Sequence, residues 1–101
     1  MNRDTITITA ERMKALGNNE RLAIVSTLSG GKKNVETIRA DVSKQMKRKS
    51  SQSGVSQHLS RLRLAGLVIV ERRGVERLYS LREVNLLGIR QAIDTIVEVR
   101  P

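Results

Sequence analysis

The segment that begins at Gln52 carries side chains that could read the edges of base pairs. Placed on a helix at about 100 degrees per residue, one of its sides shares small or hydrogen-bonding groups: Ser53, Gln57, Ser60 and Arg61. Arginine pairs bidentately with guanine, glutamine with adenine, and serine with bases or phosphate, so this side suits the major groove of DNA. The alternative is an ordinary polar helix face turned to solvent.

A second group of candidate residues surrounds Gly74, in a segment with the pattern of a β-hairpin. It consists of Arg72, Arg73 and Arg77, with Glu71 and Glu76 nearby. Arginines on an exposed hairpin can lie along a phosphate backbone, where each contact displaces about one counterion and positions the protein without reading sequence. The alternative is that these charges only protect an exposed strand edge from pairing.

The positive charge of the chain is concentrated in its middle, before and within the first of these two groups. The net charge is +9, and residues 39–66 carry seven basic groups against one acidic group. A folded surface directed at a polyanion requires this distribution, whereas the alternative is a solvated face that keeps the protein soluble. We therefore predict a nucleic-acid partner.

Composition excludes several other classes of protein. With 101 residues the chain forms one small domain, 1–101, and a multidomain enzyme is excluded. The absence of Cys removes disulfides and thiolate metal sites, and no cofactor site is visible. The longest apolar run, Leu67–Val70, is too short for a bilayer, so we expect a cytoplasmic protein associated with the nucleoid or a plasmid.

No catalytic arrangement is visible in the sequence. No pair of carboxylates accompanies His58, and no Ser or Lys nucleophile has a recognisable base. Residues 30–33, Gly-Gly-Lys-Lys, lack the preceding strand and the spacing of a phosphate-binding loop, so we interpret them as a turn between helices. The chain is not expected to be an enzyme.

The first two predicted helices lie before residue 30. Residues 5–9 alternate with period two, a strand pattern, whereas Met13 and Leu16 continue at helical spacing, so both a strand and a helix remain open for 5–9. We interpret the segment as a short extended start and then a helix from about Thr9 to Leu16, ended by Gly17. Asn18 is the expected N-cap of a second helix that stops at 30–31. The expected inward residues of this second helix are Leu22, Val25 and Leu28, with Ile24 on the shoulder.

The third and fourth predicted helices have clear caps and core faces. Asn34 can cap the third, whose inward residues are Val35, Ile38, Val42 and Met46. After the basic run at 47–49, Ser51 can cap the fourth, which runs from Gln52 to about Ala65 and ends at Gly66. The core face of the fourth helix consists of Val55, Leu59 and Leu62.

A hairpin and a fifth helix complete the predicted fold, which is mainly α with a small two-stranded β-hairpin. Strand formers occupy 67–72 and 77–81. The last helix runs from Glu83 to about Val99, and its apolar face is wider than one core stripe because it includes Val84, Leu87, Ile89, Ile93, Ile96 and Val97, with Leu86 and Val99 to spare. One stripe can pack on the domain while another meets a two-fold mate, and the alternative is a fully buried core helix.

Three of these segments resemble the ArsR/SmtB family of winged helix-turn-helix repressors. Residues 51–68 are similar to the recognition helix and strand entry of that family. Arg73-Gly74 with Tyr79 and Leu81 resembles its wing, and residues 15–18 with Arg21-Leu22 resemble its first helix junction. The resemblance covers roughly residues 10–82.

The resemblance implies a homodimer joined through the first and last helices, with recognition helices in successive major grooves. It implies helix contacts by Ser53, Ser56, Gln57 and His58 and wing contacts by Arg73 and Arg77. Helical geometry instead places Ser56 and His58 on the shoulders of the core stripe, which favours phosphate contact, and His58 could equally be a packed imidazole bonded to backbone. The full set of candidate DNA contacts is Lys47, Arg48, Lys49, Ser51, Gln52, Ser53, Ser56, Gln57, His58, Ser60, Arg61, Arg63, Arg72, Arg73 and Arg77.

The sequence departs from the family pattern in two ways. It has no Cys, and its last helix carries Asp94 and Glu98 but no His, so a metal switch is not expected. The interval from Val35 to Ser51 exceeds the usual helix-turn-helix spacing by about six residues, so residues 43–50 look inserted. We expect a third helix extended by a turn, followed by a longer basic loop.

These observations favour sequence-specific binding of duplex DNA by a homodimer that acts as a transcriptional repressor. The alternative is a plasmid partition adaptor, which would coat repeated sites and link them to a motor protein. A third hypothesis is an architectural protein without sequence preference.

Overall fold

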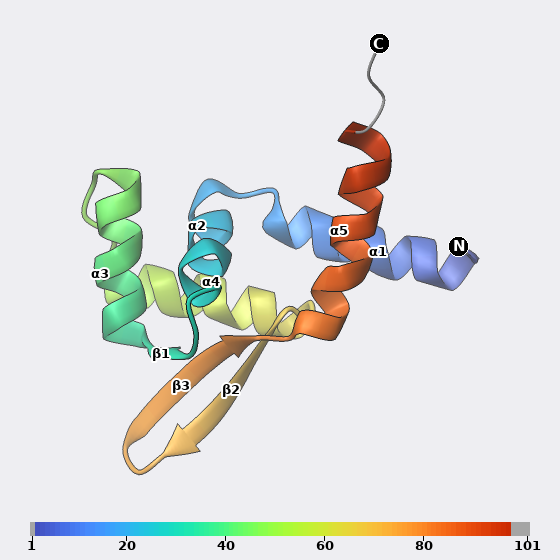
Figure 1. Cartoon of the computed structure of the whole chain (residues 1–101). Coiled ribbons are helices and arrows are strands. Elements are labelled where there is room, and N and C mark those ends of the chain that lie inside the picture. The colour runs from blue at the N-terminus through green and yellow to red at the C-terminus, as the bar shows by residue number, and fades with distance from the viewer. Residues whose placement is uncertain (1, 98–101) are drawn as a thin grey trace.

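The structure, a computed structural model, describes residues 2–97, with side-chain surroundings for 2–91. Five helices and three short strands follow one another in the order α1 (Arg3–Leu16), α2 (Asn19–Leu28), β1 (Lys33–Asn34), α3 (Val35–Met46), α4 (Gln52–Leu64), β2 (Val68–Arg73), β3 (Glu76–Leu81) and α5 (Glu83–Val97) (Figure 1). The mainly helical fold with a hairpin is confirmed.

The helix starts follow from side-chain caps that the sequence contains. Asn18 accepts hydrogen bonds from the backbone N–H groups of residues 20 and 21, Asn34 from Thr37, and Ser51 from Gly54. Each cap satisfies donors that the first turn of a helix leaves without a partner. All three predicted caps are confirmed.

The core lies where α2, α3 and α4 meet the base of the hairpin. Its fully buried members are aliphatic: Ile24, Ile38, Val42, Val55, Leu59, Leu62, Leu67 and Val68. The predicted inward faces of α3 and α4 are confirmed, since Val35 and Met46 also pack against this cluster. Helix α4 therefore packs against the core through one of its sides, the side of Val55, Leu59 and Leu62.

The expected extended start at residues 5–9 is wrong, because these residues lie inside α1. The Asn2 side chain accepts from the Thr5 N–H and caps the helix, and the Thr7 hydroxyl donates to the Arg3 carbonyl. A period-two pattern forms a strand only where another strand satisfies its backbone, and within the described residues the sheet contains no such partner for this segment.

The buried face of α2 also differs from the expected one. Leu22 is 55 % exposed, whereas Ile24 is fully buried and Ala23, Thr27 and Leu28 are buried beside it. The face is therefore centred on Ile24 rather than on the predicted stripe. The cause is tertiary, because α2 packs between α3 and α4 and both of its flanks are covered.

The hairpin forms as predicted but has a third partner. In this antiparallel sheet β3 lies between β2 and β1, with Lys33 opposite Tyr79 and Asn34 opposite Leu78. Gly74 has φ +63°, a conformation that glycine adopts without strain. The two-stranded prediction was incomplete, and Lys33, the last residue of the predicted interhelix turn at 30–33, is the first residue of β1.

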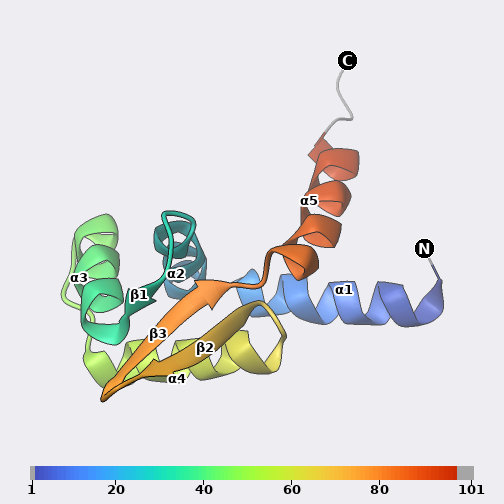
Figure 2. The same cartoon turned by 60° about the horizontal axis from the view of Figure 1, so that its bottom comes forward.

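Helix α5 crosses α1 at the end of the molecule away from the hairpin tip (Figure 2). Leu86 and Ile89 are buried, whereas Val84 is 74 % and Leu87 is 54 % exposed. Leu86 was therefore wrongly set aside as surplus, and it is a core residue. The predicted apolar side chains from Ile93 to Val99, with Asp94 and Glu98, lie outside the residues whose surroundings are described.

Between residues 2 and 97, no helix combines the length and the apolar character needed to cross a bilayer.

Candidate nucleic-acid interface

The helix-turn-helix segment consists of α3, a loop at 47–51 and α4. Helix α3 continues to Met46, so the expected extension and the longer basic loop are both confirmed. Lys47 turns the chain out of α3 in the left-handed conformation, with φ 54°. The buried Ser50 donates its N–H to the Ser43 Oγ at 3.0 Å, which returns the loop to α3.

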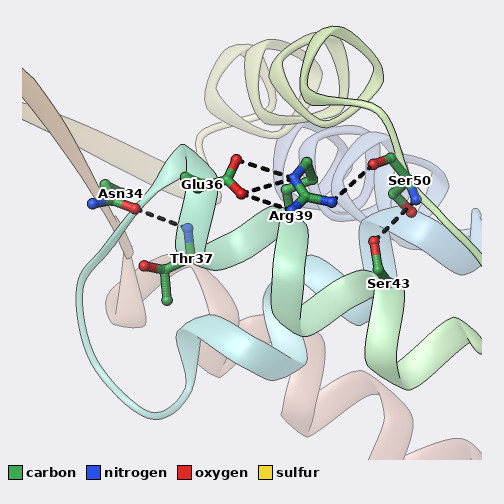
Figure 3. A network of polar contacts seen from close by, with 6 residues as sticks. All are labelled: Asn34, Glu36, Thr37, Arg39, Ser43 and Ser50. Atoms are coloured by element: carbon green, nitrogen blue, oxygen red, sulfur yellow. Dashed lines mark hydrogen bonds and ion pairs between the residues drawn. The ribbon is translucent and has the colours of Figure 1, made fainter.

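Arg39 ties α3 to the loop that precedes α4 (Figure 3). Its guanidinium pairs with Glu36 one turn earlier, at 2.6 Å between Nη2 and Oε1, and it reaches the Ser50 carbonyl at 3.5 Å. This pairing lowers the pKa of the Glu36 carboxyl and raises the pKa of Arg39. This role of Arg39 was not predicted, although the i, i+3 spacing of Glu36 and Arg39 is visible in the sequence.

A second polar cluster fixes the strand β1 against α2 and α3. Asp41 Oδ2 accepts from Lys33 Nζ at 2.9 Å and from Thr27 Oγ1 at 2.7 Å, and Lys33 also donates to the threonine oxygen at 3.1 Å. The hydrogen bond from Lys33, and then that from Thr27, lowers the pKa of Asp41. Because β1 pairs with β3, this cluster also orients the hairpin.

The polar side of α4 is exposed along its length. Ser53, Gln57, Ser60 and Arg61 are all exposed, whereas the core residues Val55, Leu59 and Leu62 are fully buried. The predicted division of this helix into a core face and a free polar face is therefore what the structure contains. The basic loop residues 47–49 and Ser51, at the start of α4, are exposed too.

Helix α4 and the hairpin share a groove of about 320 Å³. Its lining residues are Ser60, Arg63, Val70, Arg72, Arg77 and Tyr79. Within the described residues, none of the three guanidinium groups makes a side-chain hydrogen bond or ion pair. Arg72 and Arg77 lie directly opposite one another on neighbouring strands, an arrangement of like charges that is unfavourable without an anion between them.

The carboxylates of the hairpin are engaged elsewhere. Glu71 pairs with Lys32 and, at 3.6 Å, with Arg73, and the Lys32 ammonium holds the pKa of that carboxyl below its usual range. Glu76 Oε1 accepts from Asn34 Nδ2 at 2.7 Å. No carboxylate of the described residues therefore neutralises the groove arginines, whereas Arg73 points to the opposite face of the hairpin.

Gln52 and Ser56 also face the hairpin, in a second hollow of about 460 Å³ next to the groove. Arg77 and Ser60 line both hollows, so the surface between α4 and the hairpin of β2 and β3 is continuous. Arg61 lies on the other flank of α4, beside α1 and α2. Six of the candidate residues therefore line the two hollows, whereas Arg61 and Arg73 lie away from the groove.

His58 and Arg48 are drawn away from that surface by Glu20. The His58 side chain is 22 % exposed, and its Nε2 lies 3.2 Å from Glu20 Oε2, while Arg48 Nη2 lies 2.9 Å from Oε1. The imidazole is therefore packed, but its partner is this carboxylate and not the backbone. A phosphate contact by His58 requires this contact to be given up.

Among the described residues, no group of three or more His, Asp and Glu side chains could hold a metal ion.

The arrangement of elements matches known transcription regulators. A crystal structure of a possible transcriptional regulator for arsenical resistance aligns with TM-score 0.72 at 28 % identity, covering 85 % of this chain and 83 % of that one. The repressor BigR from Xylella fastidiosa aligns with TM-score 0.71 at 27 % identity, covering 95 % and 96 %.

A third similar structure is the homodimeric winged helix-turn-helix DNA-binding domain of a possible ArsR-family regulator from Mycobacterium bovis. It aligns with TM-score 0.70 at 26 % identity and covers 94 % of this chain and 86 % of that one. No protein-family model matches the sequence, and no curated protein matches it either. These structural neighbours are regulators and not enzymes, and the chain has the winged helix-turn-helix fold of the ArsR/SmtB-like regulators.

Proposed function

We propose that this protein is a transcriptional repressor that binds duplex DNA in a sequence-specific manner as a homodimer. The observation that carries the proposal is the groove in which Arg63, Arg72 and Arg77 meet beside the exposed polar side of α4. The similarity to the BigR repressor and to a homodimeric DNA-binding domain supports it.

In this proposal α4 enters the major groove and the wing follows the adjoining backbone. Gln57 and Ser53, at the middle of the exposed side, contact base edges. The groove arginines hold phosphates, which fixes the register of the helix without specifying sequence. The basic loop 47–49 adds long-range attraction to the polyanion.

The homodimer forms through α1 and α5. These helices contact each other and leave apolar side chains exposed, Ile6 and Ile8 on α1 and Val84 and Leu87 on α5. Exposed apolar side chains on two helices that contact each other support a subunit contact there. Two-fold symmetry then sets the half-sites about 34 Å apart on one face of the duplex and predicts a pseudo-palindromic operator.

The first test compares DNA sequences. Fluorescence anisotropy with the labelled region upstream of the protein's own gene, and with a scrambled duplex of the same composition, is measured in rising salt. We expect tighter binding to the upstream region and affinities that fall steeply with salt for both duplexes. Equal affinities would exclude sequence recognition while leaving DNA binding intact, and absence of salt-dependent binding would exclude the whole proposal.

A footprint on the same upstream region separates the repressor from the partition alternative. A repressor dimer protects one symmetric site, whereas a partition adaptor spreads over tandem repeats. No contact in the structure specifically favours the adaptor, so we expect the short symmetric footprint.

A further inference from the structure

The flank of α4 opposite the wing carries a second cationic hollow. It has a volume of about 530 Å³ and lies where the end of α4 meets α1 and the start of α2. Its charged lining residues are Lys14, Arg21, Arg61 and one carboxylate, Glu11. Leu64 and the alanines at 15 and 65 complete the lining.

The cations of this hollow have no partner in the described part of the chain. Lys14, Arg21 and Arg61 make no side-chain hydrogen bond or ion pair there, and the Nε atom of Arg21 is buried without an acceptor. Three cations against one carboxylate leave the hollow with an excess of positive charge, which suits an anion.

The walls of the hollow are fixed in place by contacts outside its cationic groups. Arg12, on α1, donates from Nε to the Ala65 carbonyl at 3.3 Å, and Asn85, on α5, donates to the Gly66 carbonyl at 2.5 Å. These two bonds tie α1 and α5 to the end of α4. The helices that carry Lys14 and Arg61 are consequently held together before any ligand arrives.

A helix in the major groove lies between two phosphate backbones about 12 Å apart. Arg63 and Ser60 lie on the wing flank of α4, and Arg61 lies on the opposite flank, with the exposed Ser53 and Gln57 between them. We propose that the hollow of Lys14, Arg21 and Arg61 binds a phosphate of the second DNA strand, so that α4 is held from both sides.

This inference rests on the proposed function, and its test uses the full chain. Lys14→Ala removes one cation from the hollow, and Glu11→Gln removes its single carboxylate. Both side chains are on the surface of α1, so both variants are expected to fold. The controls carry the same charge changes at α5, Arg90→Ala and Glu83→Gln, where the two wild-type side chains lie 3.5 Å apart.

Affinity for a random-sequence duplex of about 30 base pairs is measured from about 50 to 200 mM salt, together with Tm and the oligomeric state. We expect Lys14→Ala to reduce the salt slope by about 0.9 and Glu11→Gln to tighten binding about two- to fivefold. Both α5 controls should remain near wild type.

Three results would overturn the inference. Equal effects of Glu11→Gln and Glu83→Gln would indicate net charge alone. A lower Tm for Lys14→Ala with an unchanged salt slope would indicate that this cation only stabilises the end of α1. A changed monomer–dimer equilibrium with unchanged DNA affinity would indicate a subunit contact. If the wild-type protein does not bind duplex DNA, the proposed function is wrong as well. If the salt slope changes only in variants of the groove residues Arg63, Arg72 and Arg77, this inference is wrong but the proposed function is retained.

Discussion

Replacing Arg77 by alanine tests the groove between α4 and the hairpin most directly, because the variant should bind DNA more weakly and the free protein should also be more stable. Arg77 shares the groove with Arg63 and Arg72 and lies opposite Arg72 across the strands. A phosphate bound between them would offset one of their three positive charges. Without DNA, the two facing charges repel one another.

The magnitude follows from counterion release. Each phosphate contact contributes about 0.9 to the slope of log affinity against log salt, so Arg77→Ala should reduce the slope by about that amount. When salt rises fourfold, from about 50 to 200 mM, the DNA affinity of Arg77→Ala should therefore fall about 3.5-fold less than the affinity of the wild type. Relief of the cross-strand repulsion should raise Tm by about 1–2 °C at low salt.

The assay is fluorescence anisotropy on a random-sequence duplex, with differential scanning fluorimetry on the free protein. Arg77→Lys keeps the charge and should retain most of the slope, although it loses the bidentate geometry of the guanidinium. Arg73→Ala is the comparison within the hairpin, and its effect should be smaller because Arg73 pairs with Glu71 on the other face. An Arg77→Ala variant with the wild-type salt slope would refute the assignment of the groove to phosphate.

Three further predictions concern specificity, pH and assembly. Gln57→Ala should reduce the preference for the operator over scrambled DNA by about 5- to 150-fold, whereas Lys49→Ala should weaken both equally, as competition titrations can measure. Because Lys33 and Thr27 lower the pKa of Asp41, its contribution to stability is full above the unfolded-state pKa and disappears as pH falls through the lower folded value. Denaturation curves from neutral pH down to about pH 3 should therefore lose less stability in Asp41→Asn than in the wild type. Leu87→Glu should shift the protein toward monomer in analytical ultracentrifugation and weaken operator binding, and an unchanged dimer would exclude α5 as the subunit contact.

The parts of the fold that were predicted correctly are those decided by local chemistry. Asn18, Asn34 and Ser51 begin their helices because a side-chain oxygen reaches an N–H two or three residues later. Gly74 permits the hairpin turn because it adopts positive φ. Such signals depend on a few neighbouring residues, so they are visible in the sequence.

The errors arose where distant segments decide the outcome. The alternation at residues 5–9 is equally compatible with a strand and with a helix that is only partly covered, and the absence of a pairing strand in the described chain selects the helix. Leu22 is exposed because the neighbours of α2 cover the face around Ile24 instead. Strand β1 has two residues, too few for any periodicity, and it exists because β3 lies beside it.

The amino-acid sequence by itself determined the types of side chain available for binding, their helical or strand periodicity and the excess of positive charge between residues 39 and 66. Only the tertiary structure decided which arginines act together. The pairing of β2 with β3 sets Arg72 opposite Arg77, and the packing of β2 on α4 adds Arg63 to them, while Glu20 withdraws His58 and Arg48. The physical reason is that electrostatic partnership depends on distance in space, and strand register and helix packing set that distance.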